Sequence, residues 1–145
     1  MGKRTYYTNQ IDAFIKSHRL EKRVHLLHDV TFQYLPAIYQ QAEIFVYPSR
    51  FEGFGIPIIE ALHSGIPVIA ATGSCLEEAG GPDSLYVHPD DKEGMTKAIC
   101  SLLNHPEKRQ HMIEQGLKYV TRFSEQRQAE ELMNLYRSIT EEKTI

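Results

Sequence analysis

The stretch SRFEGFGIPIIEALHSGIPVIA, residues 49–70, decides the fold expected for this chain. It carries two glutamates, three glycines and two prolines among apolar residues. The apolar run 44–47 precedes it, and a second apolar run ends it. Between them, Ile58, Ile59 and Leu62 recur at helical spacing. The order strand, glycine turn, helix, strand is predicted, which is the repeating unit of a parallel α/β sheet.

Short apolar runs separated by amphipathic stretches continue on both sides of this segment. Each run is mostly apolar on both faces, as is typical of strands buried in a parallel sheet. The predicted strands are Val24–Leu27, Ile44–Tyr47, Pro67–Ala70 and Leu85–Val87. The predicted helices cover 7–18, 34–42, 57–64, 91–103 and 107–121. A last helix is predicted from an N-cap at Ser124 to about Ile139, with Leu132, Leu135 and Tyr136 facing inward.

Length and composition set limits on function. The 145 residues suit one compact domain or a piece of a larger protein, with 41% hydrophobic and 24% charged residues. A net charge of −3 argues against nucleic acid as a partner. Cys75 and Cys100 lack metal-type spacing, so two thiols in a reducing compartment are expected. We see no signal peptide and no apolar run near the ~20 residues of a membrane span.

The loop 49–56 is the candidate ligand site. It follows a parallel strand at its carboxyl end, where open α/β sheets bind ligands. Its two glycines permit a tight turn, and Pro57 suits the first position of a helix whose N-terminus attracts anions. Glu60 is expected in the first helical turn, so that Glu52 and Glu60 border one cleft. Acids near a helix N-terminus also stabilise the helix by ~0.3–1 kcal/mol without any ligand, so spacing alone leaves both interpretations open.

The same stretch resembles the signature of retaining, nucleotide-sugar-dependent glycosyltransferases built from two Rossmann-like domains, the GT-B type of group 1. Their signature has the form E-G-F-G-x-P-x-x-E-A followed by G-x-P-V-I-A, with seven residues between the two glutamates, and every position is matched here. The resemblance extends over about residues 8–140. It implies a Rossmann-like parallel sheet with flanking helices, and makes residues 1–145 a partial C-terminal nucleotide-sugar-binding domain.

The resemblance also implies roles for particular residues. Glu60 is similar to the glutamate that holds the ribose hydroxyls of the nucleotide. Glu52 matches the one beside the donor hexose and is the candidate catalytic residue, though not an established nucleophile. The resemblance implies that the sugar and phosphates lie along the backbone of four residues, Gly53, Phe54, Gly55 and Ile56. It implies that the nucleotide base is bordered by a loop containing Asp29 and Val30. No metal or other cofactor is expected. His28 stands where the family commonly has glycine, and Glu77 and Glu78 are expected to cap a helix.

The family's second domain normally starts with two strands and a basic pair that clamps the pyrophosphate, and these are missing from the sequence. So is the N-terminal domain that holds the acceptor. Lys3 and Arg4 do not occupy the clamp position. At ~1.5–3 kcal/mol for each charge-assisted hydrogen bond, losing two partners weakens donor binding roughly a hundred- to ten-thousandfold. We therefore expect the parent protein to be an active hexosyltransferase and this chain alone to be inactive.

Further expectations follow from this assignment. The partners would be a nucleotide-diphosphate sugar and a glycan or lipid-linked acceptor, as in polysaccharide synthesis. The location would be cytoplasmic, with peripheral membrane attachment of the parent left open. The strand Ile44–Tyr47 should form an open edge, filled either by a dimer contact or by Val24–Leu27. The alternatives are a non-catalytic binding or assembly module and, less favoured because no G-x-G-x-x-G is present, a dinucleotide oxidoreductase.

Overall fold

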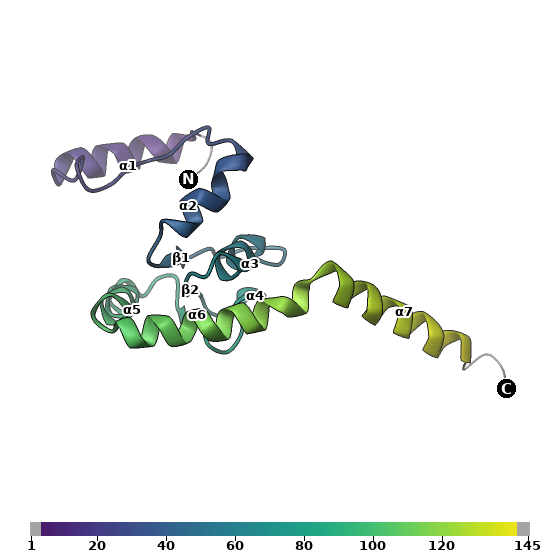
Figure 1. Ribbon diagram of the computed structural model, residues 1–145. Coiled ribbons are helices and arrows are strands. Elements are labelled where there is room, and N and C mark those ends of the chain that lie inside the picture. The colour runs from purple at the N-terminus through teal and green to yellow at the C-terminus, as the bar shows by residue number, and fades with distance from the viewer. Residues whose placement is uncertain (1–3, 142–145) are drawn as a thin grey trace. The chain divides into compact units, whose positions relative to one another are not determined.

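The computed structural model describes residues 4–141, and the chain divides into two compact units, Met1–Ile38 and Tyr39–Ile145 (Figure 1). The first unit contains the helix α1, Tyr6–Ser17, and the 3₁₀ turn η1, Phe32–Tyr34. Ile15 is the buried apolar residue of α1. The short helix α2, Leu35–Gln40, crosses the boundary between the two units.

The predicted strand Val24–Leu27 is wrong, because the structure has no strand there. The segment follows a turn in which the N–H of Val24 donates to the carbonyl of Leu20 at 2.9 Å. Val24 and Leu27 are both exposed. An apolar run becomes a strand only when a neighbouring strand takes up its backbone hydrogen bonds, and among the described residues this segment has no such neighbour.

The second unit is built on a three-stranded parallel sheet in the order β1-β2-β3. The strands are β1, Phe45–Tyr47, β2, Val68–Ala71, and β3, Leu85–Val87. Val46 pairs with Ile69, and Ala70 pairs with Tyr86. The central strand β2 is buried throughout, whereas β1 and β3 are only half-buried. Three of the four predicted strands and the α/β class are therefore confirmed.

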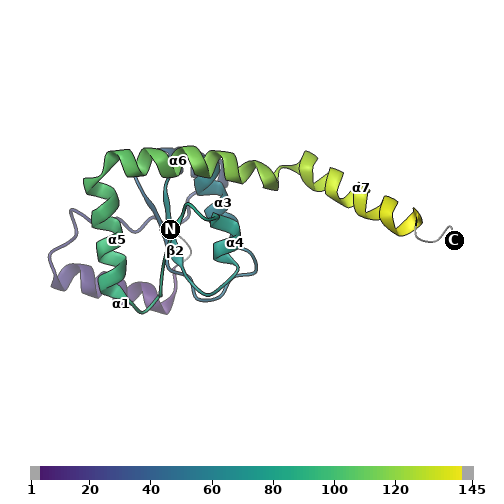
Figure 2. The ribbon, with the colours of Figure 1, turned by 90° about the horizontal axis from the view of Figure 1, so that it is seen from below.

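Helices cover both faces of this sheet. They are α3, Ile56–His63, α4, Leu76–Gly80, α5, Lys92–Asn104, and α6, Pro106–Val120. On one face, Ile58 and Leu62 of α3 and Leu76 of α4 pack with Val68 and Ala70. On the other face, Leu102 of α5 and Met112 of α6 pack on Ile69. Figure 2 shows α5 on one side of β2, α3 with α4 on the other, and α6 running from one group to the other.

The last helix, α7, Glu125–Glu141, follows the 3₁₀ turn η2, Thr121–Phe123. The hydroxyl of Ser124 accepts a hydrogen bond from the N–H of Arg127 at 3.4 Å, which confirms the predicted N-cap. The prediction that Leu132, Leu135 and Tyr136 face inward is wrong, because each is about half exposed. Amphipathic spacing indicates an apolar helix face, but within the described residues nothing covers this one.

Candidate functional site

A cleft of about 620 Å³ opens at the carboxyl edge of the sheet. It lies between the loop after β1 and the loop after β2, where the polar residues that follow parallel strands gather. Its lining residues are Arg50, Phe51, Glu52, Gly53, Gly73, Ser74 and Cys75. The cleft is thus built from the predicted loop 49–56 and from a second loop that sequence analysis had not assigned to the site.

The glycine turn places the start of α3 beside this cleft. Gly55 caps the helix with a φ of +102°, and a Cβ there would lie 2.8 Å from Cδ2 of Leu76. Only glycine fits that position without strain. Pro57 was predicted to be the first residue of the helix. It is the second, because α3 begins at Ile56. Among the described residues, the N–H groups of Gly53, Phe54 and Gly55 donate to no acceptor.

Glu52 is exposed, yet two hydroxyls hold its side chain. The phenol of Tyr47 donates to Oε1 at 2.6 Å, and the hydroxyl of Ser49 donates to the same oxygen at 2.7 Å. These hydrogen bonds, that of Tyr47 first, lower the pKa of Glu52 below its usual range. Burial, helped by the bond to Glu52, raises the pKa of Tyr47 to about 12. Glu52 is therefore ionised and Tyr47 neutral at pH 7.

Glu60 has a comparable tyrosine partner. It is the fifth residue of α3, and no acid lies in the first turn, which corrects the predicted position. The phenol of Tyr39 donates to Oε2 of Glu60 at 2.9 Å. Burial, followed by this hydrogen bond, raises the pKa of Tyr39. Glu60 is half-buried, and the residues that line the cleft include Glu52 but not Glu60.

The second wall of the cleft is fixed by Glu77. Its Oε1 accepts hydrogen bonds from the hydroxyl of Thr72 and, at 2.9 Å, from the N–H of Gly73. Both bonds lower the pKa of Glu77. Cys75, in the same loop, donates its thiol to the backbone carbonyl of Glu52 at 3.3 Å. The predicted helix-capping role of Glu77 and Glu78 is not found, because the N-terminus of α4 has no side-chain cap and Glu77 instead binds Thr72 and Gly73, which precede the helix. The thiol of Cys75 brings the two walls of the cleft into contact.

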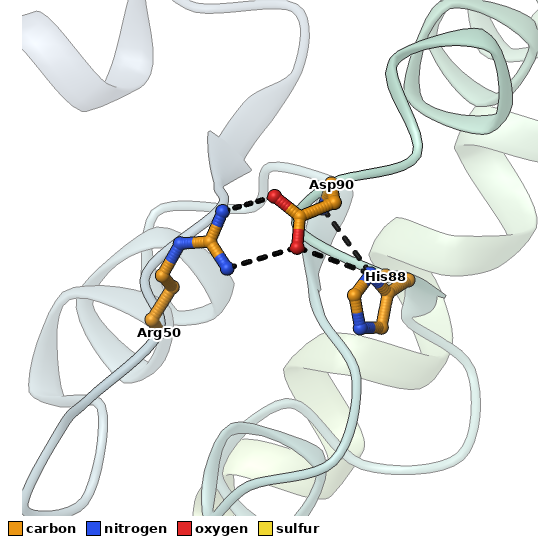
Figure 3. A network of polar contacts seen from close by, with 3 residues as sticks. All are labelled: Arg50, His88 and Asp90. Atoms are coloured by element: carbon orange, nitrogen blue, oxygen red, sulfur yellow. Dashed lines mark hydrogen bonds and ion pairs between the residues drawn. The ribbon is translucent and has the colours of Figure 1, made fainter.

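An exposed ion pair joins the loop after β1 to the loop after β3. The guanidinium of Arg50 donates to both carboxylate oxygens of Asp90, and Nδ1 of His88 lies 3.9 Å from Oδ2 of Asp90 (Figure 3). The hydrogen bond from Arg50 lowers the pKa of Asp90. All three strands therefore contribute residues to the same edge of the sheet.

The remaining predicted site residues lie in different surroundings. The half-buried ring of Phe54 packs against the core and meets the ring of Phe123 edge-on, with ring centroids 5.5 Å apart. Ile56 is exposed at the start of α3. Val30 is half-buried in the first unit, next to Asp29, whose φ is +55°. The role of Val30 at the nucleotide base stays a prediction.

Sequence reasoning missed the hydroxyls that hold the two glutamates. Tyr47 is the last residue of β1, so its place at the carboxyl end of a strand was a usable signal. Tyr39 precedes Glu60 by 21 residues, and nothing in the spacing links the two. Arg50 and Asp90 are 40 residues apart, and only the parallel order of the strands brings them together.

Residues 4–141 hold no group of three or more histidine, cysteine, aspartate or glutamate side chains arranged to bind a metal ion. No helix in that range has both the length and the apolar character that a membrane span requires.

Comparisons with known proteins agree with the geometry. The model of the family Glycosyl transferases group 1 matches residues 4–119. The chain is 38% identical over 104 residues to the O-antigen chain mannosyltransferase RfbU of Salmonella typhimurium, a match that covers 72% of this chain and 30% of that protein. This chain thus spans about a third or less of the length of the curated relatives it matches.

Solved structures give the same fold. A sucrose-phosphate synthase from Thermosynechococcus elongatus superposes with a TM-score of 0.79 and 29% identity, over 91% of this chain and 34% of that one. Anabaena HepE, solved in complex with UDP, superposes with a TM-score of 0.80 and 21% identity, over 92% of this chain and 39% of that one. The Rossmann-like fold predicted from the sequence is confirmed.

Proposed function

Because this chain belongs to the group 1 glycosyltransferases, we propose that it forms the donor-binding part of an enzyme that transfers a hexose from a nucleotide-diphosphate sugar. The acceptor would be a glycan or a lipid-linked sugar, and the anomeric configuration would be retained. Among the possible products we favour a surface polysaccharide, because RfbU is an O-antigen chain mannosyltransferase. We assign acceptor binding to a second domain outside this chain.

One observation carries the proposal: the ionised carboxylate of Glu52, in the lining of the cleft, is followed in the chain by a run of backbone N–H groups that have no acceptor among the described residues, of which that of Gly53 belongs to the cleft lining. A carboxylate accepts hydrogen bonds from sugar hydroxyls, which suits Glu52 to the hexose. The N–H groups of Gly53, Phe54 and Gly55 can donate to phosphate oxygens at the start of α3. Glu60, one helical turn further on, is suited to the hydroxyls of the ribose.

No metal or other cofactor enters this proposal. The charge of the diphosphate would be met by backbone donors and by the helix dipole. The leaving phosphate would help to deprotonate the acceptor hydroxyl as that hydroxyl attacks the anomeric carbon on the face from which the phosphate departs. In this scheme Glu52 stabilises the reacting sugar and forms no covalent bond to it.

Saturation-transfer NMR on the chain can test donor binding even at millimolar affinity. The probes are UDP, GDP and their hexose conjugates. We expect saturation on ribose and hexose protons, with Glu60→Ala weakening the ribose signals and Glu52→Ala the hexose signals. Glu93→Ala, an exposed position on α5, is the matched control and should change neither. Equal signals from all three variants, or no saturation of any probe by the wild type, would count against donor binding.

A further inference from the structure

The two hydroxyls that reach Glu52 end on the same oxygen. Tyr47 and Ser49 both donate to Oε1, at 2.6 and 2.7 Å. Among the described residues, no donor reaches Oε2. A carboxylate oxygen offers about two acceptor positions, so Oε1 is filled while Oε2 keeps its full capacity for a ligand. The side chain is thus held by one oxygen, and the other remains to accept hydrogen bonds.

Tyr47 fixes this arrangement to the rigid part of the fold. Tyr47 pairs with Ala70 of β2, and its ring stacks on the ring of Phe45 with centroids 5.7 Å apart. Glu52, by contrast, is an exposed residue on a loop, with a long side chain that would otherwise move among rotamers. The thiol of Cys75 holds the backbone carbonyl of Glu52 from the other wall of the cleft. The side chain of Glu52 is therefore tied to the strand β1 through Tyr47, and its backbone is tied to the loop before α4 through Cys75.

Other charged groups of the cleft do not compete for this carboxylate. Arg50, two residues away, is engaged by Asp90, and Asp90 lies near His88. The carboxylate of Glu77 is taken up by its own loop. Among the described residues, the groups that bind Glu52 are thus the two hydroxyl donors at its carboxylate and the Cys75 thiol at its backbone carbonyl.

We propose that Tyr47 and Ser49 are positioning residues, which hold Oε1 of Glu52 so that Oε2 accepts a hydroxyl of the donor hexose. This role rests on the proposed function, because it takes Glu52 as the residue beside the hexose. It adds a specificity element: the hydroxyl recognised by Glu52 must lie where one fixed oxygen can reach it. A freely rotating carboxylate would impose no such restriction.

The hold on Glu52 can be measured without any ligand. Side-chain ¹³C NMR follows the titration of the Glu52 carboxyl in the wild type, in Tyr47→Phe and in Ser49→Ala. We expect both substitutions to raise the pKa of Glu52 toward that of an unbonded glutamate, and Ser49→Thr to restore it. Tyr86→Phe is the matched control, since Tyr86 lies on β3 and donates to the carbonyl of Gly81. An unchanged titration of Glu52 in Tyr47→Phe and Ser49→Ala would overturn the proposal.

Affinity measurements then distinguish a failure of the positioning role from a failure of the proposed function. Tyr47→Phe should reduce the extra affinity for a nucleotide-diphosphate hexose over the bare nucleoside diphosphate roughly two- to tenfold, as expected for one net hydrogen bond. A shifted titration with full retention of that extra affinity would refute the positioning role alone. If the wild type itself has no extra affinity for the hexose conjugate, the placement of Glu52 beside the hexose fails, and the positioning role fails with it.

Discussion

At the scale of single residues, each signature glutamate has a neutral tyrosine as its hydrogen-bond donor. Tyr47 donates a hydrogen bond to Glu52, and Tyr39 donates one to Glu60. Burial raises the pKa of both phenols. The spacing of the glutamates was readable from the sequence, because it follows from one loop and one helix. The tyrosines were not, because their proximity depends on how β1 and α2 lie against that loop and helix.

The two glutamates should differ in kinetic effect in a complete enzyme built on this domain. Under the proposed function, Glu60→Ala would remove contacts to the ribose, which does not change during the reaction, so we expect a higher KM with kcat nearly unchanged. The proposal places Glu52 beside the reacting sugar, so Glu52→Ala should lower kcat by a larger factor than it raises KM. Steady-state kinetics with a varied donor would test this, and wild-type values for both variants would refute the assignment.

Glu77 should make stability depend on pH in a defined window. Its pKa is lowered in the folded chain from an ordinary value of 4.5. Its contribution is therefore present above about pH 4.5 and is lost as the pH falls through the lower folded value. We expect Glu77→Gln to lower the Tm at pH 7, and the difference from the wild type to shrink as the pH falls through the folded pKa of Glu77.

The neighbouring position supplies the control for this experiment. Glu78→Gln changes the same charge in the same helical turn, but among the described residues its carboxylate accepts no hydrogen bond. Thermal unfolding of both variants at several pH values would compare them directly. An equal effect of the two substitutions at pH 7 would show that net charge, and not the bond to the Gly73 loop, is responsible.

At the scale of elements, the two glycines of the turn between β1 and α3 have different roles, which the sequence alone did not distinguish. Gly55 is required by its positive φ and by close packing on Leu76, whereas a Cβ on Gly53 would meet nothing within 4 Å. Gly55 therefore shapes the fold, whereas Gly53 has open space around it, which the proposed function assigns to the donor.

Alanine substitutions should distinguish the two glycines. Gly55→Ala adds left-handed strain and a clash, and we expect a loss of about 1–3 kcal/mol in the free energy of unfolding. Gly53→Ala should stay within about 0.5 kcal/mol of the wild type but weaken binding of nucleotide-diphosphate sugars, because its Cβ occupies ligand space. Denaturant unfolding and donor titration of both variants would check this. Equal stability of the two variants would contradict it.

The buried apolar faces that the sequence predicted correctly belong to strands and helices whose partners are present in the same unit. The strand β2 and the helices α3 and α5 bury their apolar residues against one another, so their periodicity and their packing agree. The apolar spacing of Val24–Leu27 and α7 was real, but no described neighbour completes a sheet or a core around it. A pattern in one segment specifies a buried face only when another segment covers that face.

At the scale of the whole molecule, β1 forms an open edge of the sheet, because no strand of residues 4–141 pairs with its outer side. This edge was predicted, but its predicted pairing with Val24–Leu27 is not found, and a dimer through the edge stays a proposal. The N–H of Phe45 donates to the carbonyl of Pro67 at 3.0 Å. Because successive residues of a strand alternate in direction, the N–H of the next residue, Val46, points to the open side. Unpaired edges of this kind invite pairing with another chain.

Hydrogen exchange would reveal such a dimer. We expect the Val46 amide to become more protected as protein concentration rises, together with a dimer in sedimentation. The Phe45 amide, already bonded within the sheet, is an internal control and should not respond. A Val46 amide that exchanges at one rate at all concentrations, in a chain that sediments as a monomer, would contradict dimerisation through this edge.

Chemical-shift mapping of the ¹⁵N-labelled chain tests the central claim most directly, because it locates a bound donor on the molecule. A nucleotide-diphosphate hexose added at millimolar concentration should shift the amides of residues 52–60 and of the facing loop at Gly73–Cys75. Glu60→Ala should weaken these shifts, while Glu93→Ala should preserve them. Shifts confined to other surfaces, or no shifts at saturating donor, would contradict a donor site built around Glu52 and Glu60.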